Sequence, residues 1–265
     1  MSIIQSIILG AIQGLGEFLP ISSTAHLVLL PYFTGWADPG LSFDIALHIG
    51  TLIAVLAFFW KDWLNIFTSA INTVKKEGIS GFKKEILFYL IVGTIPGVLF
   101  GLLFEKKAET VFRSPLVIAI ALIIAGAILY WADKKYKGNK ELKDVSLKDS
   151  IIIGLCQAIA IIPGVSRSGI TITAGLFNNF NRTEAARFSF LLSTPIIMGS
   201  AVLKMPELLS AGINSNLIAG ILASAIFGYA AIKYLLKFLG KFGYGIFFWY
   251  RLGLGIVIIL FYLTR

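Results

Sequence analysis

The chain has 265 residues, of which 57% are hydrophobic and 14% are charged. Soluble proteins carry about 25% charged residues, so this composition argues against a soluble protein and predicts an integral membrane protein with several spans. The formal net charge is +9. We attribute that excess to basic loops on one face of a membrane, and we expect no nucleic-acid partner.

Six segments are apolar and long enough to cross a bilayer as helices. They cover about residues 43–60, 86–104, 115–132, 188–203, 217–232 and 245–262. The sequence therefore predicts an all-α polytopic membrane protein with six spans, in which residues 1–265 form a single integral membrane domain.

Two further apolar segments, residues 2–34 and 150–178, are interrupted near their middles. The first is broken at residues 20–24 and the second at residues 163–169, both of which contain proline. Each half is too short to cross a bilayer alone. We expect each segment to form a helix–break–helix hairpin that enters and leaves the membrane on one side, with its irregular backbone buried in protein.

The two hairpins resemble each other and suggest an internal repeat. Matching residues at a constant offset are Ser6–Gly10 with Ser150–Gly154, Gln13 with Gln157, and Ser22 with Ser166. Three spans follow each hairpin, which gives two repeats at about residues 1–132 and 146–265. An odd number of spans per repeat inverts the second repeat, and matching broken segments indicate a site near the midplane of the membrane.

The basic residues of the loops predict the orientation. Sixteen lysines and arginines are expected on the face that holds the 133–149 loop, and five, including Arg265, on the other face. Cytoplasmic loops carry the excess of basic residues. We therefore expect the 133–149 loop in the cytoplasm, both termini outside, and the two hairpins entering from opposite faces.

The break in the second hairpin, residues 163–171, carries an arginine inside an apolar region. Arginine at membrane depth is costly and usually faces a cavity with a function. Ser166 and Ser168 can cap the helix that follows, and the N–H groups of a helix start and a guanidinium group both suit phosphate. We expect an oxyanion site made by Ser166, Arg167, Ser168 and Thr171. The alternative is that Arg167 snorkels or pairs with one acid.

The first hairpin carries a candidate metal ligand. Gln13 and Glu17 are four residues apart and therefore share a helix face. Glu17 suits an ion of the magnesium or calcium type, which binds few carboxylates together with the phosphate oxygens of a substrate. A plain ion pair between Glu17 and Arg167 is the alternative.

Hydroxyl groups and a histidine follow in the same hairpin. Ser22 and Ser23 can cap the second helix or contact a substrate. His26 lies one turn further on, where a histidine–hydroxyl pair can form. The alternative for His26 is a buried core histidine with a hydrogen-bonded ring.

Two other polar residues lie in apolar segments. His48 follows Asp44 by four residues, and we interpret that pair as structural, with a small chance that it lines the entrance of the site. Arg251 can snorkel or pair with an acid, and the sequence does not decide between these alternatives.

Gln13-Gly-Leu-Gly-Glu17-Phe-Leu-Pro-Ile-Ser-Ser-Thr-Ala-His26 and Pro163-Gly-Val-Ser-Arg-Ser-Gly-Ile-Thr171 resemble the two signature motifs of the bacterial undecaprenyl-diphosphatase family, also called bacitracin-resistance proteins. The resemblance covers nearly the whole chain. It implies an enzyme of the bacterial cytoplasmic membrane that hydrolyses undecaprenyl diphosphate to undecaprenyl phosphate, the lipid carrier of cell-wall synthesis. It further implies a divalent metal ion, Mg²⁺ or Ca²⁺, and a site that faces the outer side.

The resemblance also implies roles for individual residues. Glu17, Ser23, His26 and Arg167 would be catalytic, and Glu17 would hold the metal with Gln13 beside it. Many family members carry glutamate at position 13, so glutamine here puts a site with two carboxylates in doubt. For phosphate binding the resemblance implies Ser166, Arg167 and Thr171, to which we add Ser22 and Ser168 from their places at the two breaks.

Ser23 and His26 would share the roles of nucleophile and base in an order that the sequence does not give, and water is a further candidate nucleophile. A polyprenyl diphosphate and membrane lipids are the expected partners, and a homo-oligomer is possible. The competing class is a transporter or flippase for a polyprenyl phosphate. Glu17 and His26 favour the enzyme, because moving an anion requires neither a metal ion nor an acid–base group.

Overall fold

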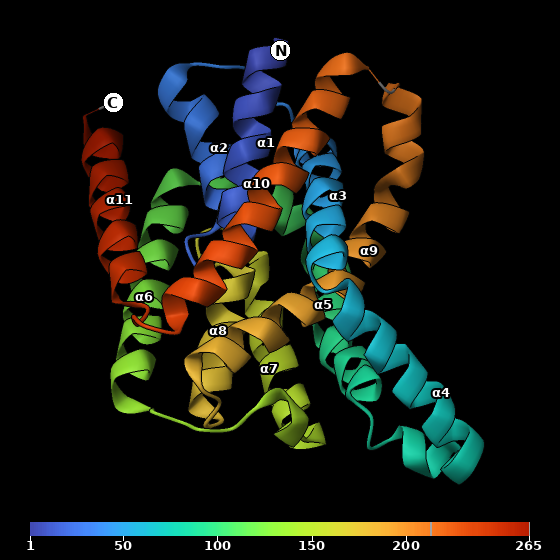
Figure 1. Ribbon diagram of the computed structural model, residues 1–265. Coiled ribbons are helices and arrows are strands. Elements are labelled where there is room, and N and C mark those ends of the chain that lie inside the picture. Colours follow the sequence, from blue (N-terminus) through green and yellow to red (C-terminus); the bar gives the residue numbers. More distant parts are fainter. Residues whose placement is uncertain (213, 265) are drawn as a thin grey trace.

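The computed structural model describes residues 1–212 and 214–264 (Figure 1). Regular structure in these residues is helical, apart from one isolated bridge between Lys140 and Phe180. Five helices of the described chain are long and apolar enough to cross a membrane, or six if the bent pair α3–α4 forms one span. The prediction of an all-α polytopic membrane protein is confirmed.

The first half of the chain begins with a hairpin whose first helix starts at a capping box made by Ser2 and Gln5. Its helices are α1 (Ile3–Phe18), α2 (Ser23–Thr34), α3 (Leu41–Phe58), α4 (Trp60–Phe82), α5 (Ile86–Glu109) and α6 (Pro115–Lys135).

The helix α4 occupies the stretch between the predicted spans at 43–60 and 86–104, where the apolar pattern indicates a basic loop. It meets α3 at an angle of 73°. Trp63, Ile66 and Ala70 are buried on one side of it, whereas Lys75 and Lys76 are exposed. An amphipathic helix with many charges has low hydropathy, and a search for apolar runs therefore passes over it.

The second half repeats the order of elements, with a hairpin first and three long helices after it. Asn181 caps the first long helix by accepting a hydrogen bond from the backbone of Glu184. The helices are α7 (Leu147–Ala158), α8 (Arg167–Phe177), α9 (Arg182–Ala211), α10 (Ser215–Leu239) and α11 (Gly245–Leu263).

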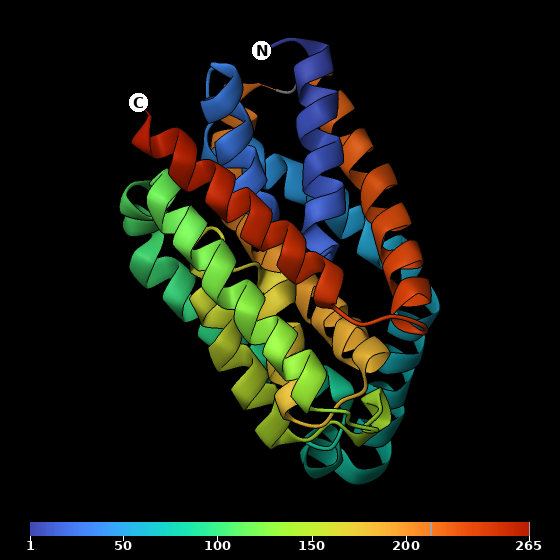
Figure 2. The same ribbon diagram turned by 90° about the vertical axis from the view of Figure 1, so that its left-hand side faces the viewer.

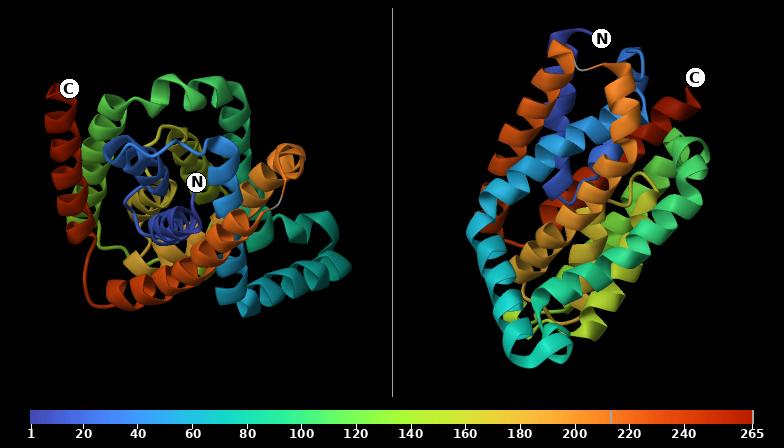
Figure 3. Two further views of the ribbon diagram at one scale, coloured as in Figure 1. Left: turned by 90° about the horizontal axis from the view of Figure 1, so that it is seen from above. Right: turned by 90° about the vertical axis from the view of Figure 1, so that its right-hand side faces the viewer.

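Both predicted hairpins are present, and they enter from opposite ends of the molecule so that their turns meet near its middle (Figure 1). Ser22 caps α2 and Ser166 caps α8, and both have a positive φ, of 70° and 71°. Residues other than glycine rarely adopt this conformation, and such strain gathers at functional sites. Seen from above, α1 and α2 lie inside a ring that includes α5, α6, α10 and α11 (Figure 3).

Each hairpin packs its first helix against the other half of the chain, α1 against α10 and α7 against α5. Glycines allow the backbones to approach closely there. A Cβ atom on Gly10 would lie 2.2 Å from the carbonyl oxygen of Gly220, and one on Gly154 would lie 2.4 Å from that of Gly93. These contacts agree with two corresponding halves, and the repeat boundaries stay a prediction.

The N-terminus and the end of α11 lie at the same end of the molecule, and the 133–149 loop lies at the other end (Figure 1). The helix α11 runs alongside α6 (Figure 2). Arg265, which we expected on the outer face, lies outside the described residues.

Candidate active site

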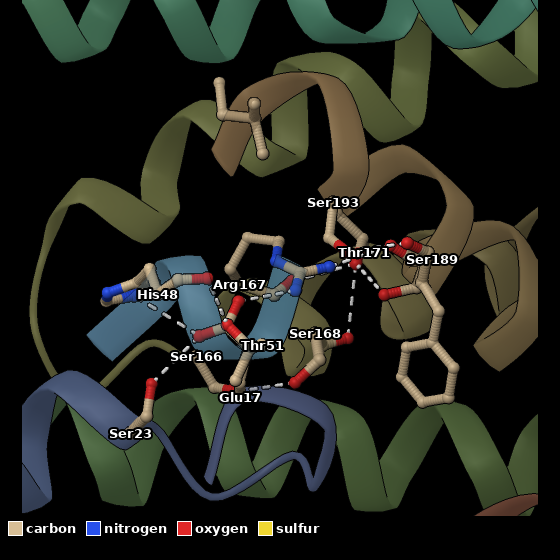
Figure 4. A network of polar contacts seen from close by, with 12 residues as sticks. Glu17, Ser23, His48, Thr51, Ser166, Arg167, Ser168, Thr171, Ser189 and Ser193 are labelled. Atoms are coloured by element: carbon tan, nitrogen blue, oxygen red, sulfur yellow. Dashed lines mark hydrogen bonds and ion pairs between the residues drawn. The ribbon is translucent and has the colours of Figure 1, made fainter. Parts of the chain in front are cut away.

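The two hairpins are joined by an ion pair between Glu17, near the end of α1, and Arg167, the first residue of α8 (Figure 4). Nη2 of Arg167 lies 2.6 Å from Oε1 of Glu17. Its Nη1 donates a hydrogen bond of 2.8 Å to the backbone carbonyl of Ser189 on α9. The ion pair that the sequence offered as an alternative is therefore present, and it is buried, with Glu17 only 7% exposed.

Three further side chains contact the second carboxylate oxygen of Glu17. Oε2 accepts hydrogen bonds from Nε2 of Gln13 at 3.0 Å and from Oγ of Ser23 at 3.1 Å. Nε2 of His48 lies 3.4 Å from the same oxygen. The predicted shared face of Gln13 and Glu17 is confirmed, and Glu17 is the centre of the polar network.

Three of the predicted phosphate-binding hydroxyl groups lie at the two turns, and two of them cap helices. Oγ of Ser22 accepts a hydrogen bond of 3.0 Å from the backbone N–H of Gly164 in the other hairpin. Oγ of Ser166 caps α8 and lies 3.2 Å from Oγ of Ser168, which donates to the carbonyl of Leu19 at 3.3 Å. The capping interpretation is confirmed for Ser22 and Ser166, and phosphate binding by these three residues stays a prediction.

The remaining predicted phosphate ligand, Thr171, lies one turn into α8. Its Oγ1 is 2.7 Å from Oγ of Ser189 and donates at 2.8 Å to the carbonyl of Arg167. Thr171 and Ser189 therefore belong to the same network as the arginine.

His26 does not form the predicted pair with Ser23. Its Nδ1 lies 2.8 Å from the carbonyl of Ser22, its Nε2 lies 2.6 Å from the hydroxyl of Tyr250 on α11, and the two rings stack. Because a carbonyl oxygen only accepts, Nδ1 carries the hydrogen and Nε2 accepts from Tyr250. The prediction failed because Ser23 turns to Glu17 while the imidazole turns back to the start of its own helix.

Three residues of the site, His48, Tyr250 and Arg251, were missed or left undecided by the sequence. His48 reaches Glu17 from α3, and its Nδ1 contacts the carbonyl of Asp44 rather than its carboxylate. The only signal for His48 was a histidine inside an apolar span.

Arg251 on α11 is completely buried and contacts both hairpin turns. Its guanidinium group donates to the carbonyl oxygens of Pro20 at 3.4 Å, Gly164 at 2.7 Å and Val165 at 3.0 Å. In the described part of the chain it forms no ion pair with an acid, so neither alternative from the sequence is correct. Broken helices leave free carbonyl oxygens, and these supply the partners that a buried arginine needs.

The described residues contain no group of three or more histidine, cysteine or acidic side chains that could hold a metal ion. Next to Glu17, however, Oε1 of Gln13 is buried without a hydrogen-bond partner. One carboxylate beside a free amide oxygen fits a divalent ion that takes other ligands from a phosphate group or from water.

The fold and the site define a polytopic helical membrane protein with a buried, charged site between two broken hairpins. Residues 6–257 match the family described as bacitracin resistance protein BacA, and the chain belongs to that family. It is 52% identical over 266 residues to the undecaprenyl-diphosphatase of Moorella thermoacetica, with 100% of both chains covered. It is 50% identical to the undecaprenyl-diphosphatase of Elusimicrobium minutum, with 98% of each chain covered.

Proposed function

We propose that this protein is an undecaprenyl-diphosphatase, which hydrolyses undecaprenyl diphosphate to undecaprenyl phosphate and inorganic phosphate. Relatives that match along their whole length carry this name. The observation in the structure that best supports this function is the ion pair between Glu17 and Arg167, which joins the two hairpins. The reaction recycles the lipid carrier of cell-wall synthesis, which accounts for bacitracin resistance.

We assign the binding of the diphosphate to Arg167 and the start of α8. Arginine has five N–H donors in a planar fork that matches phosphate oxygens. In Arg167, one terminal nitrogen donates to the carboxylate of Glu17 and the other to the carbonyl of Ser189. The free N–H groups at the start of α8 attract an anion to the same place. Thr171 contacts the backbone of Arg167 and holds this turn in place.

We assign the nucleophilic role to Ser23. Its hydroxyl donates to Oε2 of Glu17. That carboxylate would take the proton as Oγ attacks the terminal phosphorus, and the anhydride bond breaks to release undecaprenyl phosphate. A water molecule then cleaves the phosphoserine. His26 is the candidate base for that water through the hydroxyl of Tyr250, which donates to Nε2 and would pass on the proton that it takes from the water.

The ion that fits this site would be held by Glu17 and Gln13. A divalent ion of the Mg²⁺ or Ca²⁺ type would neutralise charge that develops on the phosphate oxygens.

Phosphate release by the purified protein tests the proposed function. The protein in detergent is mixed with undecaprenyl diphosphate and a divalent ion, and inorganic phosphate is measured over time. We expect release that stops when the metal ion is chelated and returns when it is added back. A folded protein that releases no phosphate under any of these conditions would exclude the hydrolase and favour a carrier of the lipid.

Replacing Tyr250 with phenylalanine is expected to lower kcat by about 5- to 10-fold, the equivalent of one hydrogen bond of about 1 kcal/mol. The substitution removes the hydroxyl that contacts Nε2 of His26 but keeps the stacked ring. Tyr262→Phe is the control, because Tyr262 lies on the same helix and is 44% exposed, against 45% for Tyr250. Equal activity of the two variants would mean that Tyr250 does not act on His26.

We propose that the protein lies in the bacterial cytoplasmic membrane with its site open to the outer side. Lys107 and Lys137 are both exposed and lie on the two opposite faces predicted from the loop charges. In a Cys156→Ser background, we expect Lys107→Cys to react with a membrane-impermeant thiol reagent in intact cells and Lys137→Cys to react only after lysis. The reverse pattern would invert the topology.

A further inference from the structure

Nε2 of His48 lies beside Glu17 at a distance that fits two arrangements, an ion pair with a protonated ring or a cation shared with a neutral ring. Its Nδ1 lies 2.7 Å from the carbonyl oxygen of Asp44. A carbonyl oxygen accepts and never donates, so Nδ1 carries its hydrogen. In the neutral ring, Nε2 then holds a lone pair, and this atom lies 3.4 Å from Oε2 of Glu17 (Figure 4).

With a neutral His48, two acceptor atoms face each other across a buried gap, and a cation between them resolves the conflict; a protonated ring would instead donate to Oε2 of Glu17. N–H···O hydrogen bonds measure about 2.7–3.2 Å, shorter than the separation of Nε2 and Oε2. Two ligand atoms on one divalent ion lie about 3.0–3.4 Å apart, given bonds of about 2.1–2.4 Å. The observed separation falls within that interval.

A third candidate ligand atom belongs to Gln13, which contacts Glu17. Gln13 donates its Nε2 to Oε2 of Glu17, and its own Oε1 is buried without a partner. Gln13 offers a neutral oxygen, so Glu17 supplies the only negative charge among the three side chains. The neutral ring of His48 adds a good donor atom without adding charge.

The surroundings of His48 are those of a metal-binding histidine. Such residues almost always donate their other ring N–H to a carboxylate, a carbonyl or water, which fixes the ring. Here the carbonyl of Asp44 has that role, and Thr51 donates to the carbonyl of His48 on the same helix. The carboxylate of Asp44 is held in turn by Arg113, at 3.5 Å.

We propose that Nε2 of His48 is a direct ligand of the divalent ion, together with Glu17 and Oε1 of Gln13. The proposal rests on the hydrolase function above and names the ligand that completes its metal site. An imidazole ligand suits Mn²⁺ or Zn²⁺ better than Mg²⁺ or Ca²⁺. Mn²⁺ is therefore a suitable probe of this ligand.

Pulsed electron paramagnetic resonance of bound Mn²⁺ tests the ligand directly. The purified full-length protein is loaded with Mn²⁺ in detergent, with and without inorganic phosphate, and nitrogen coupling is measured by spin-echo envelope modulation. The chain contains two histidines, so His48→Gln and His26→Gln form a matched pair. We expect imidazole nitrogen coupling in the wild type and in His26→Gln, and its loss in His48→Gln, with Mn²⁺ affinity at least about 10-fold weaker.

Several outcomes would overturn the proposal. Bound Mn²⁺ without nitrogen coupling would mean that His48 is only a charged partner of Glu17. Nitrogen coupling that survives in His48→Gln, or no Mn²⁺ binding with or without phosphate, would also exclude the ligand. A melting curve of His48→Gln that matches the wild type excludes misfolding as the cause of a lost signal.

The resonance experiment is independent of turnover, so it separates the ligand from the proposed function. Coupling that depends on His48 in a protein that releases no phosphate would keep the ligand and overturn the hydrolase. Phosphate release by a protein whose bound Mn²⁺ shows no nitrogen coupling would keep the hydrolase and overturn the ligand.

Discussion

Arg167→Lys is expected to lower kcat for undecaprenyl diphosphate by about 10²–10³ and to change KM much less. In the structure the two terminal nitrogens of Arg167 contact Glu17 and the carbonyl of Ser189. Lysine carries one nitrogen and cannot serve both partners and a phosphoryl group at once. The demand for these donors rises as charge shifts in the transition state, so the loss falls on kcat, while the lipid tail still contributes to binding.

The matched control is Arg187→Lys, which makes the same chemical change in α9 at the basic end of the molecule. Arg187 pairs with Asp62 and Glu184 and contacts no residue of the site. We expect activity close to that of the wild type. If the Arg167→Lys enzyme stays within about threefold of wild-type kcat, Arg167 is a charge partner of Glu17 and does not grip the phosphate.

The fold could be predicted from the sequence to the extent that it depends on apolar length and on breaks. Five of the six apolar runs lie within helices, and the run at 43–60 covers most of α3 and ends at the first residue of α4. The proline-containing breaks fall at the turns of both hairpins. The apolar pattern does not predict the helix α4, because its charged face lowers the mean hydropathy of the segment. Its bend of 73° against α3 depends on tertiary packing rather than on a local signal.

The residues of the site also divide into those that the sequence predicts and those that it does not. Gln13 and Glu17 followed from their spacing on one helix, and Arg167 followed from the cost of a charge in an apolar region. The contact of His26 with Tyr250 and the contacts of Arg251 could not be found, because each joins residues more than 80 positions apart. A local sequence pattern does not predict contacts between residues so far apart in the chain.

Glu17→Gln is expected to lower the free energy of unfolding by about 3–5 kcal/mol, the usual effect of removing one partner from a buried ion pair. The side chain of Arg167 is only 14% exposed and would keep its charge without the carboxylate. Glutamine still accepts a hydrogen bond from Ser23, so the loss of stability comes from the unpaired charge of Arg167. Unfolding of the purified variant by heat or denaturant in detergent measures the effect, and a variant as stable as the wild type would contradict it.

Adding Arg167→Met to Glu17→Gln separates the role of the pair in stability from its role in chemistry. Methionine fills the space of the arginine stem and removes the uncompensated charge, and replacing both members of a buried pair is often nearly neutral. We therefore expect the double variant to recover at least half of the lost stability, a coupling that a double-mutant cycle measures. Activity should not return, because the double variant has neither the fork for phosphate nor the carboxylate that orients Ser23. Recovered stability without recovered phosphate release would show that the reaction requires the charged pair, since an uncharged pair is then enough to hold the hairpins together.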